Sequence, residues 1–249
     1  MRYFLHLAYN GASFCGWQLQ PNAPTVQENI EIALKHLLKE KIDITGCGRT
    51  DTGVHAFDYY AHFDYREMSL EELSQLKLKL NRYFNHEINI LGIYKMKEDA
   101  HARFDAISRT YKYYVATEKQ PFKNDISYYF HRPLNLEEMN KACEKLITYT
   151  DFTSFSKSHT QVNNYNCNVA LAYWEKEGDI LVFTIKANRF LRNMVRAIVG
   201  TLLDVGLGKI DVEEFCNIIE SKSRCEAGIS VPAKGLFLYD VEYKKTIFL

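Results

Sequence analysis

The sequence lacks most of the features that identify common classes of protein at first sight. No apolar run approaches the ~18 residues of a membrane span. Its six cysteines include no C-x-x-C pair, and no Cys/His group has the spacing of a zinc site. Neither a Walker-type glycine loop nor a Ser/His/Asp order of the hydrolase kind is present. We therefore expect reduced thiols in a cytoplasmic protein that does not enter the membrane.

The chain also has no formal net charge and no linker-like segment. The 31 Lys and Arg residues balance the 31 Asp and Glu residues, so a polyanionic partner must meet a local basic patch. No Ser/Gly/Pro-rich linker and no low-complexity segment divides the chain. The opening MRYFLHLAYNG is typical of a strand and not of a signal peptide. With 249 residues, the chain is long enough for one large domain or two small ones with a real core.

Apolar periodicity predicts a first half of strands and helices. Thr25 and Ser69 are placed to cap helices, because an N-cap hydroxyl accepts hydrogen bonds from the first turn. Glu28, three residues after Thr25, matches the pattern of a capping box. The expected elements are a strand over 2–9 that ends in a turn at Asn10-Gly11, the two capped helices, which extend to residues 40 and 84, and strands over 54–65 and 88–96.

The second half repeats the strand-helix-strand order. Its elements are a strand over 109–117, a helix capped at Asn135, a hairpin turning near Gly178-Asp179, a helix over 190–206, a short helix over 211–221 and a strand over 235–243. This duplication predicts an α+β fold, in which each half has helices on one side of a largely antiparallel sheet. We place the halves at residues 1–104 and 105–249 and expect a rigid interface between them.

The stretch GCGRTDTGVHAF, residues 46–57, suits neither a helix nor a strand at its start. Its three glycines let the backbone bend and let another molecule approach closely. Asp51 lies between them, two residues after Arg49, where a loop tip held by the following strand would present its carboxylate. Taken alone, the pattern favours a plain turn in which Asp51 accepts local hydrogen bonds. We interpret the nearby His55 as structural support.

The segment ANRFLRNMVRAIVG, residues 187–200, is rich in arginine. Arg189, Arg192 and Arg196 are spaced i, i+3 and i+7, which predicts one stripe of a helix. Guanidinium groups match phosphate and carboxylate geometry, so the stripe suits an anionic partner. A solvated helix face would have the same spacing, and the segment alone leaves both interpretations open.

Cations and aromatic rings are mixed in HARFDAISRTYKYYV, residues 101–115. Such a mixture suits single-stranded nucleic acid, because rings stack on bases while arginines meet phosphates; the residues are Arg103, Phe104, Arg109, Tyr111, Tyr113 and Tyr114. The alternation of Tyr111 and Tyr113 is also typical of any half-buried strand. For Tyr113 and Tyr114, the side chains of a half-buried strand are the better interpretation.

Together and in this order, the motifs resemble the TruA family of tRNA pseudouridine synthases. GRTDTGVHA is the most specific block, and the resemblance covers nearly the whole chain. The other matching blocks are YNGASFCGWQLQ, TVQENIEIAL, AHARFDA, SRTYKYYV, DFTSFSK, NRFLRNMVRAIVGTLLDVG and PAKGLFLYDVEY. The chain departs from the family at Asn10, at Phe57-Asp58 and in the insert SHTQVNNYN, where many members carry an arginine.

The resemblance implies both a fold and an activity. Family members isomerise uridine to pseudouridine at positions 38, 39 and 40 of the tRNA anticodon stem-loop, without a cofactor or a metal. They act as homodimers, and one tRNA contacts both subunits. Two RRM/ferredoxin-like halves join their sheets, and the active cleft is central. This plan agrees with the duplicated order of elements.

The resemblance also implies roles for single residues. Asp51 is the nucleophile, and Arg196 matches the arginine that keeps this acid ionised against the effect of burial. Tyr111 stacks on the target base and is a candidate to remove the C5 proton, although a free phenol titrates near ~10. Arg49 helps to turn the uridine out of its stack, and Leu236 forms an apolar wall. Phosphate contacts are expected from Arg103, Arg109, Arg189 and Arg192.

Two other functions are compatible with parts of the sequence. A non-catalytic RNA-binding module of two RRM-like halves would keep the cations and rings but would not need Asp51. A cytoplasmic hydrolase would use Asp51 with His55 or His101 and would release a product.

Overall fold

A computed structural model describes residues 1–157 and 164–249 and divides the chain into two compact units. Unit 1 comprises Met1–Ile107 and Leu238–Leu249, and unit 2 comprises Ser108–Phe237. The sequence prediction had assigned all of residues 105–249 to the second half. The C-terminal segment Leu238–Leu249 instead belongs to unit 1, where its backbone bonds to residues 95–97: Leu249 N donates to Lys95 O, and Lys97 N donates to Ile247 O.

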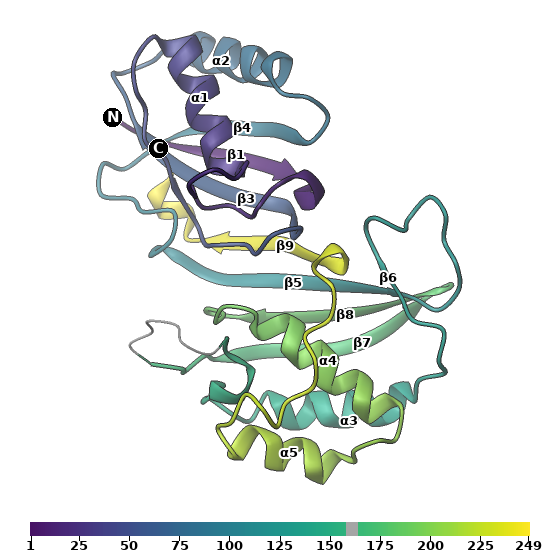
Figure 1. Cartoon of the computed structure of the whole chain (residues 1–249). Helices are drawn as coiled ribbons and strands as arrows, with labels where there is room; N and C mark the ends of the chain where they lie inside the picture. Colours follow the sequence, from purple (N-terminus) through teal and green to yellow (C-terminus); the bar gives the residue numbers. More distant parts are fainter. Residues whose placement is uncertain (158–163) are drawn as a thin grey trace. The chain divides into compact units, whose positions relative to one another are not determined.

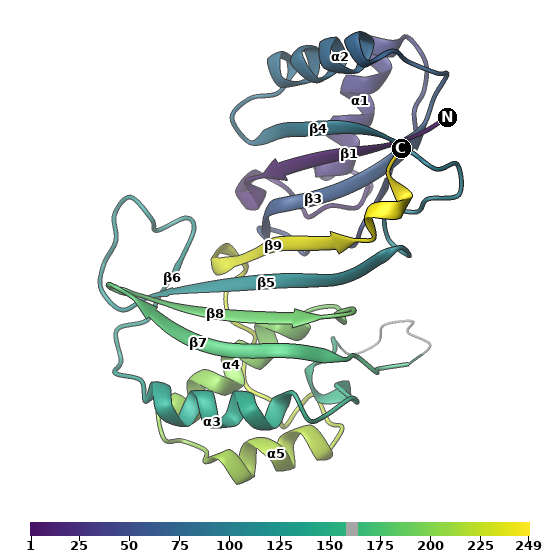
Figure 2. The same cartoon turned by 180° about the vertical axis from the view of Figure 1, so that it is seen from behind.

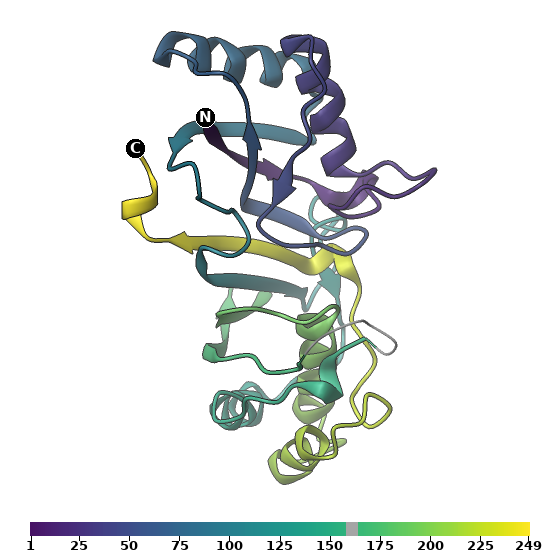
Figure 3. The same cartoon turned by 90° about the vertical axis from the view of Figure 1, so that its left-hand side faces the viewer.

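Unit 1 is built on an antiparallel sheet. The three predicted strands are present as β1 (Arg2–Tyr9), β3 (His55–Asp64) and β4 (Ile88–Met96). Strand β1 lies between β3 and β4 and pairs antiparallel with both. The short β2 (Thr45–Gly46) pairs with β3, and β9 (Leu236–Tyr243) lies on the side of β3 away from β1. Both chain termini lie at the same edge of this unit (Figure 3).

Two helices, α1 (Val26–Leu38) and α2 (Leu70–Tyr83), cover one face of this sheet (Figure 1). Both predicted N-caps are confirmed. Thr25 Oγ1 accepts from Glu28 N at 3.3 Å, and Ser69 forms a complete capping box with Glu72. On the opposite face, the Phe4 ring contacts two rings of the C-terminal segment. Its centroid lies 5.4 Å from that of Tyr243 and 6.2 Å from that of Phe248, and these contacts hold the segment in place.

Unit 2 contains β5 (Ala106–Ala116), β8 (Ile180–Ala187) and β7 (Val169–Glu177), which pair antiparallel in that order (Figure 2). The predicted hairpin is confirmed, and it turns at Gly178, whose φ is +60°. Asn135 caps its helix as predicted. The other elements are β6 (Tyr128–Tyr129), which pairs with the end of β5, α3 (Leu136–Leu146), α4 (Met194–Gly206) and α5 (Val212–Glu220).

The prediction of one arginine stripe on a helix over 190–206 is wrong at its start. Asn193 has φ +68°, a left-handed conformation that ends any helical path from residue 190, so α4 begins at Met194. Arg189 and Arg192 therefore precede the helix, and only Arg196 lies on it. The other end is as expected: α4 ends at Gly206, and Gly208 follows with φ +65°.

The α+β class is confirmed in both units, with helices α3, α4 and α5 packed on one face of the unit 2 sheet (Figure 2). Within the two described ranges, no helix combines the length and the apolar character that crossing a bilayer requires.

Candidate active site

Asp51 lies at the start of a tight turn in unit 1. Its carbonyl accepts from Val54 N at 3.1 Å, and Gly53 has φ +77° at the third position of the turn. That conformation is the one a type II turn requires, and glycine adopts it without strain. The Asp51 side chain is half-buried, while Arg49 is exposed. The turn enters β3 directly at His55, which supports the expectation that a strand holds the loop.

Two glycines let the surrounding segments approach the Asp51 loop. Gly16 has φ +86°, and a Cβ there would lie 2.4 Å from Thr50 O. A Cβ on Gly46 would lie 2.5 Å from Trp17 Nε1 and would also collide with Tyr59. Gly48 differs, because nothing lies within 4 Å of its Cβ position. The glycines at 16 and 46 are therefore required by close contact, whereas the one at 48 is not.

The segment Asn10–Trp17 supports the Asp51 loop by backbone hydrogen bonds. Gly53 N donates to Phe14 O, and Trp17 N donates to Thr50 O, both at 3.3 Å. Gly11 N donates to His55 Nδ1 at 3.1 Å, which confirms the structural interpretation of this buried histidine. Asn10 Oδ1 accepts from Ala12 N, so asparagine at this family position holds its own turn.

Three buried aromatic rings lie beneath the same loop. Trp17 stacks on Tyr59 with ring centroids 4.1 Å apart, and Tyr9 packs on both. The Tyr9 hydroxyl bonds to Thr50 Oγ1 at 2.9 Å, and the Tyr59 hydroxyl donates to Gly48 O. The backbone is thus anchored on the N-terminal side of Asp51, next to both Arg49 and Asp51. Sequence reasoning missed this role; the signal was a Trp in a glycine-rich segment opposite an aromatic strand.

Asp58, at the second family departure, also has a structural role. Its carboxylate contacts His6 Nε2 at 2.5 Å and accepts from Val241 N at 2.7 Å, so it links three neighbouring strands. The adjacent Phe57 is exposed and contacts the Tyr239 ring. The third departure falls largely on residues 158–163, outside the described residues.

Arg103 lies on a turn that histidines fix. His101 Nδ1 accepts from Arg103 N and Phe104 N, and His62 Nδ1 accepts from Ala102 N at 3.1 Å. Burial lowers the pKa of His62 to about 4 and also lowers the pKa of His101, which keeps both imidazoles neutral acceptors. The Arg103 guanidinium lies 5.6 Å from the exposed Phe104 ring. The turn thus presents a cation beside an aromatic ring.

In unit 2, Tyr111 and Tyr113 differ more than their sequence suggests. Tyr113 is fully buried, and its hydroxyl donates to Pro232 O at 2.8 Å, which agrees with a structural role. Tyr111 is only half-buried; it pairs with Ile185 of β8 and meets the Phe190 ring edge-on at 5.0 Å. A base could therefore reach Tyr111 more readily than Tyr113.

Two of the predicted phosphate-binding arginines lie at one end of the unit 2 sheet. Arg109 is opposite Ala187 and donates to Asn188 O at 2.9 Å, and Arg189 follows directly and donates to Asn164 Oδ1. The exposed Arg192 lies in the loop before α4. The structure brings Arg109, Arg189 and Tyr111 together around the ends of β5 and β8.

Arg196 and Gly235, the residue before Leu236, both lie close to Tyr113. Arg196, in the first turn of α4, donates through Nε to Val231 O at 2.7 Å. Its charge opposes the rise that burial causes in the pKa of Tyr113. Leu236, buried at the start of β9, follows Gly235, whose Cβ would lie 2.8 Å from the Tyr113 ring. In unit 2 the predicted arginine and the residue that precedes the predicted apolar wall thus lie near one buried tyrosine.

Comparison with known proteins identifies the family. A family model described as tRNA pseudouridine synthase matches residues 142–244. The tRNA pseudouridine synthase A of Parabacteroides distasonis is 54% identical over 99% of this chain and 98% of its own length. The protein of the same name from Bacteroides fragilis is 50% identical with the same coverage, and that of Francisella tularensis subsp. novicida is 37% identical over 99% and 95%. The chain belongs to the tRNA pseudouridine synthase A family.

The family resemblance predicted from the motifs is therefore confirmed over nearly the whole chain. The six cysteines of this family member are free thiols. Within residues 1–157 and 164–249, no group of three or more His, Cys, Asp or Glu side chains is placed to hold a metal ion.

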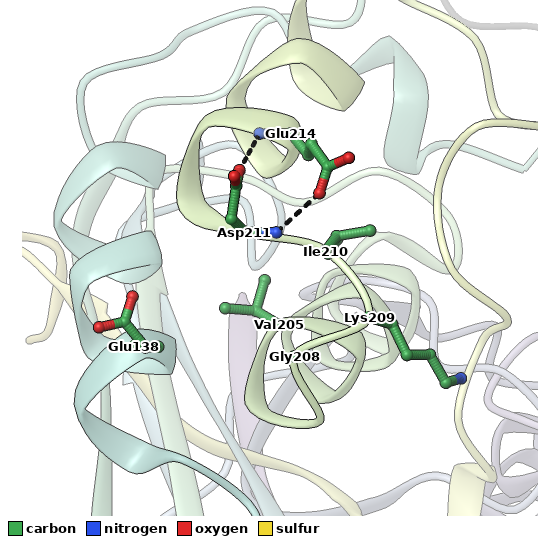
Figure 4. Close-up of a pocket in the computed structure, with 7 residues that line it drawn as sticks. All are labelled: Glu138, Val205, Gly208, Lys209, Ile210, Asp211 and Glu214. Carbon is green, nitrogen blue, oxygen red and sulfur yellow. Dashed lines mark hydrogen bonds between the residues drawn. The ribbon is translucent and has the colours of Figure 1, made fainter.

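Unit 2 has a hollow of about 320 Å³ where α3, α4 and α5 meet (Figure 4). Its carboxylates include Asp211 and Glu214, which form the capping box of α5 and bond to each other's backbone N–H. None of the site residues predicted from the family lines it. The hollow belongs to the helical layer and not to the candidate active site.

Proposed function

We propose that this chain converts uridine to pseudouridine at positions 38, 39 and 40 of the tRNA anticodon stem-loop, with Asp51 as the nucleophile. The observation that carries this proposal is the Asp51 turn, a half-buried carboxylate on backbone anchored by three buried rings, in a chain with full-length family membership. A rigid loop suits a group that must meet one reacting carbon in a fixed geometry.

The reaction breaks the C1′–N1 bond, turns the uracil over and joins C1′ to C5. N1 gains a proton and C5 loses one, so the isomerisation needs no redox step and no external group. An ionised Asp51 can attack the sugar or the base, or can stabilise an oxocarbenium-like centre. Arg196 serves as the cation that favours the ionised form of this acid, because a nearby positive charge offsets the cost of desolvation.

The remaining residues bind and orient the RNA. Tyr111 stacks on the target base, and Leu236 supplies an apolar wall. Arg49 is exposed two residues from Asp51 on the anchored loop, which suits a side chain that enters the RNA as the uridine turns out. Phosphate contacts fall to Arg103, Arg109, Arg189 and Arg192. We further propose that the enzyme is a cytoplasmic homodimer and needs no cofactor.

One assay tests the proposal. The chain is incubated with tRNA whose uridines carry tritium at C5, and tritium release is followed together with strand integrity. We expect release of tritium from positions 38–40 without cleavage of the tRNA strand. Binding of the tRNA without tritium release would support the RNA-binding module, and cleavage or a released base would support a hydrolase; either result rejects the synthase.

A further inference from the structure

The segment between α5 and β9 folds back along helix α4. We name residues 224–232 of this segment the strap. A Cβ on Gly200 would lie 1.9 Å from Ile229 O, so the helix backbone and the strap backbone are in direct contact. Gly228 N donates to Thr201 Oγ1 at 2.9 Å, and a Cβ on Gly228 would lie 2.9 Å from Thr201 N. The strap therefore has a fixed register along α4.

This register delivers the strap to Arg196. Val231 N donates to Arg196 O at 3.2 Å, and Val231 O accepts from Arg196 Nε at 2.7 Å. The second bond holds the guanidinium at its inner nitrogen. A hydrogen bond at Nε sets the plane of the guanidinium and so the direction of its two terminal nitrogens.

Apolar burial alone does not hold the strap in place, because Ile229 in its middle is 89% exposed. Arg224 adds three hydrogen bonds within the strap to the contacts that the strap makes with α4. Its NH1 group donates to Ala227 O and Gly228 O, both at 3.2 Å, and its NH2 group donates to Ser230 Oγ at 2.8 Å. Ser230 Oγ also accepts from Asn193 Nδ2, the left-handed residue in front of α4.

We infer that Arg224 is a positioning residue for Arg196: it shapes the strap so that Val231 O fixes the Arg196 guanidinium. The inference rests on the proposed role of Arg196 in catalysis. Arg224 lies 28 positions after Arg196 in the sequence and acts only through the strap. Loss of Arg224 frees the strap carbonyls, so Arg196 loses its fixed direction while the helix that carries it remains. Turnover therefore falls more than substrate binding does.

A double-mutant cycle tests this inference with Arg224→Met, Arg196→Met and the double variant. The kcat and KM for tRNA are measured, and urea unfolding monitors the fold. We expect Arg196→Met to lower kcat by roughly 10²–10³-fold, in the range that loss of one preorganised cation costs. We expect Arg224→Met to lower kcat by roughly 10–10²-fold with KM within about threefold, as a misplaced group does. The double variant should fall within about threefold of Arg196→Met.

The outcomes separate the inference from the function beneath it. Losses that multiply in the double variant, or a normal rate for Arg224→Met, overturn the positioning role while the proposed function stands. A normal rate for Arg196→Met removes the role of Arg196 and the inference together. A fall in kcat of Arg224→Met that is explained by a matching loss of unfolding free energy would also count against positioning, because a purely structural role would produce it.

A smaller change keeps the test decisive if Arg224→Met fails to fold. Ser230→Ala removes only the hydroxyl that Arg224 and Asn193 share. We expect it to lower kcat by roughly 3–10-fold, and this loss should vanish in the Arg196→Met background. The matched control is Ile229→Ala, on the same strap but with an exposed side chain, which should keep the normal kcat. No loss in Ser230→Ala, or an equal loss in Ile229→Ala, overturns the inference.

Discussion

Asp51 in unit 1 lies on a turn that buried rings and close glycine contacts hold, whereas Arg196 in unit 2 lies on a helix whose guanidinium is held by a strap. The supports of Asp51 bond to the residues on its N-terminal side: Tyr59 and Trp17 bond to the carbonyl oxygens of Gly48 and Thr50, and Tyr9 bonds to the Thr50 hydroxyl. The supports of Arg196 bond to the side chain itself, at Nε. The first arrangement fixes the backbone position from which the short Asp51 side chain extends. The second fixes the guanidinium at the end of the long Arg196 side chain.

The chemical nature of the supports also differs. Unit 1 uses neutral groups, among them the imidazoles of His55, His62 and His101, as acceptors for backbone N–H groups. The unit 2 strap is held by a charged side chain, Arg224, and by the amide of Asn193. We therefore expect steric changes and low pH to damage unit 1, and removal of a guanidinium to damage the strap of unit 2.

The largest effect is expected where the chemistry itself is removed from the supported loop. Asp51→Asn keeps the shape of the side chain but removes the charge and the nucleophile, so pseudouridine formation should fall at least ~10³-fold. Binding of tRNA should stay within a few fold, as measured by filter binding. Asp43→Asn is the matched control, because this exposed acid forms a surface ion pair with the nearby Lys41. Loss of binding and fold together would make Asp51 a structural residue and break the comparison.

A methyl group at Gly16 should disturb the contacts that support the Asp51 loop and leave the Asp51 side chain itself unchanged. Gly16→Ala places Cβ 2.4 Å from Thr50 O at a φ of +86°, and we expect unfolding to become easier by about 2–4 kcal/mol. Gly48→Ala is the control in the same loop, since its Cβ meets nothing within 4 Å, and it should change stability by less than about 1 kcal/mol. Urea unfolding measures both, and equal losses would show that contact at Gly16 is unimportant.

Acid should weaken unit 1 through its buried imidazole. Burial, helped by the Arg2 charge and opposed by Asp64 and Asp105, places the pKa of His62 at about 4 in the folded chain, below the ordinary 6.5. The unfolded chain therefore binds the proton first as pH falls, so stability present above pH 6.5 is lost toward pH 4. Between pH 7 and pH 5 this loss should be on the order of 1–2 kcal/mol.

The variant His62→Asn tests this acid effect, because an amide oxygen can still accept from Ala102 N but does not titrate. Urea unfolding at pH 7 and pH 5 should show a smaller difference in this variant than in the unaltered chain. His36→Asn, an exposed histidine on α1, should leave the difference unchanged. If both variants behave alike, the pH dependence does not come from the buried ring.

The smallest effect is expected at a single phosphate contact. Arg103→Gln on the histidine-fixed turn should lower tRNA affinity by less than about tenfold and should reduce the slope of log affinity against log salt by about 1. Arg82→Gln, an exposed arginine in the last turn of α2, serves as the control and should leave the slope unchanged. An unchanged slope for Arg103→Gln would remove this arginine from the RNA-binding surface.

The sequence by itself determined the elements and the family. Caps at Thr25, Ser69 and Asn135 and the turn at Gly178 were predictable, because a cap or a tight turn depends on residues only a few positions apart. The ordered motifs placed Asp51 on a glycine-rich loop and pointed to the family, since motif order needs no coordinates.

Tertiary structure alone decided the start of α4, the hydrogen-bond partner of Tyr113, the return of the C-terminal segment to unit 1 and the strap at Arg196. Each of these depends on hydrogen bonds or ring contacts between residues far apart in the chain, such as Arg196 with Val231 and Tyr113 with Pro232. Local propensity carries no information about such partners, because their energy exists only once the chain has folded and brought them into contact.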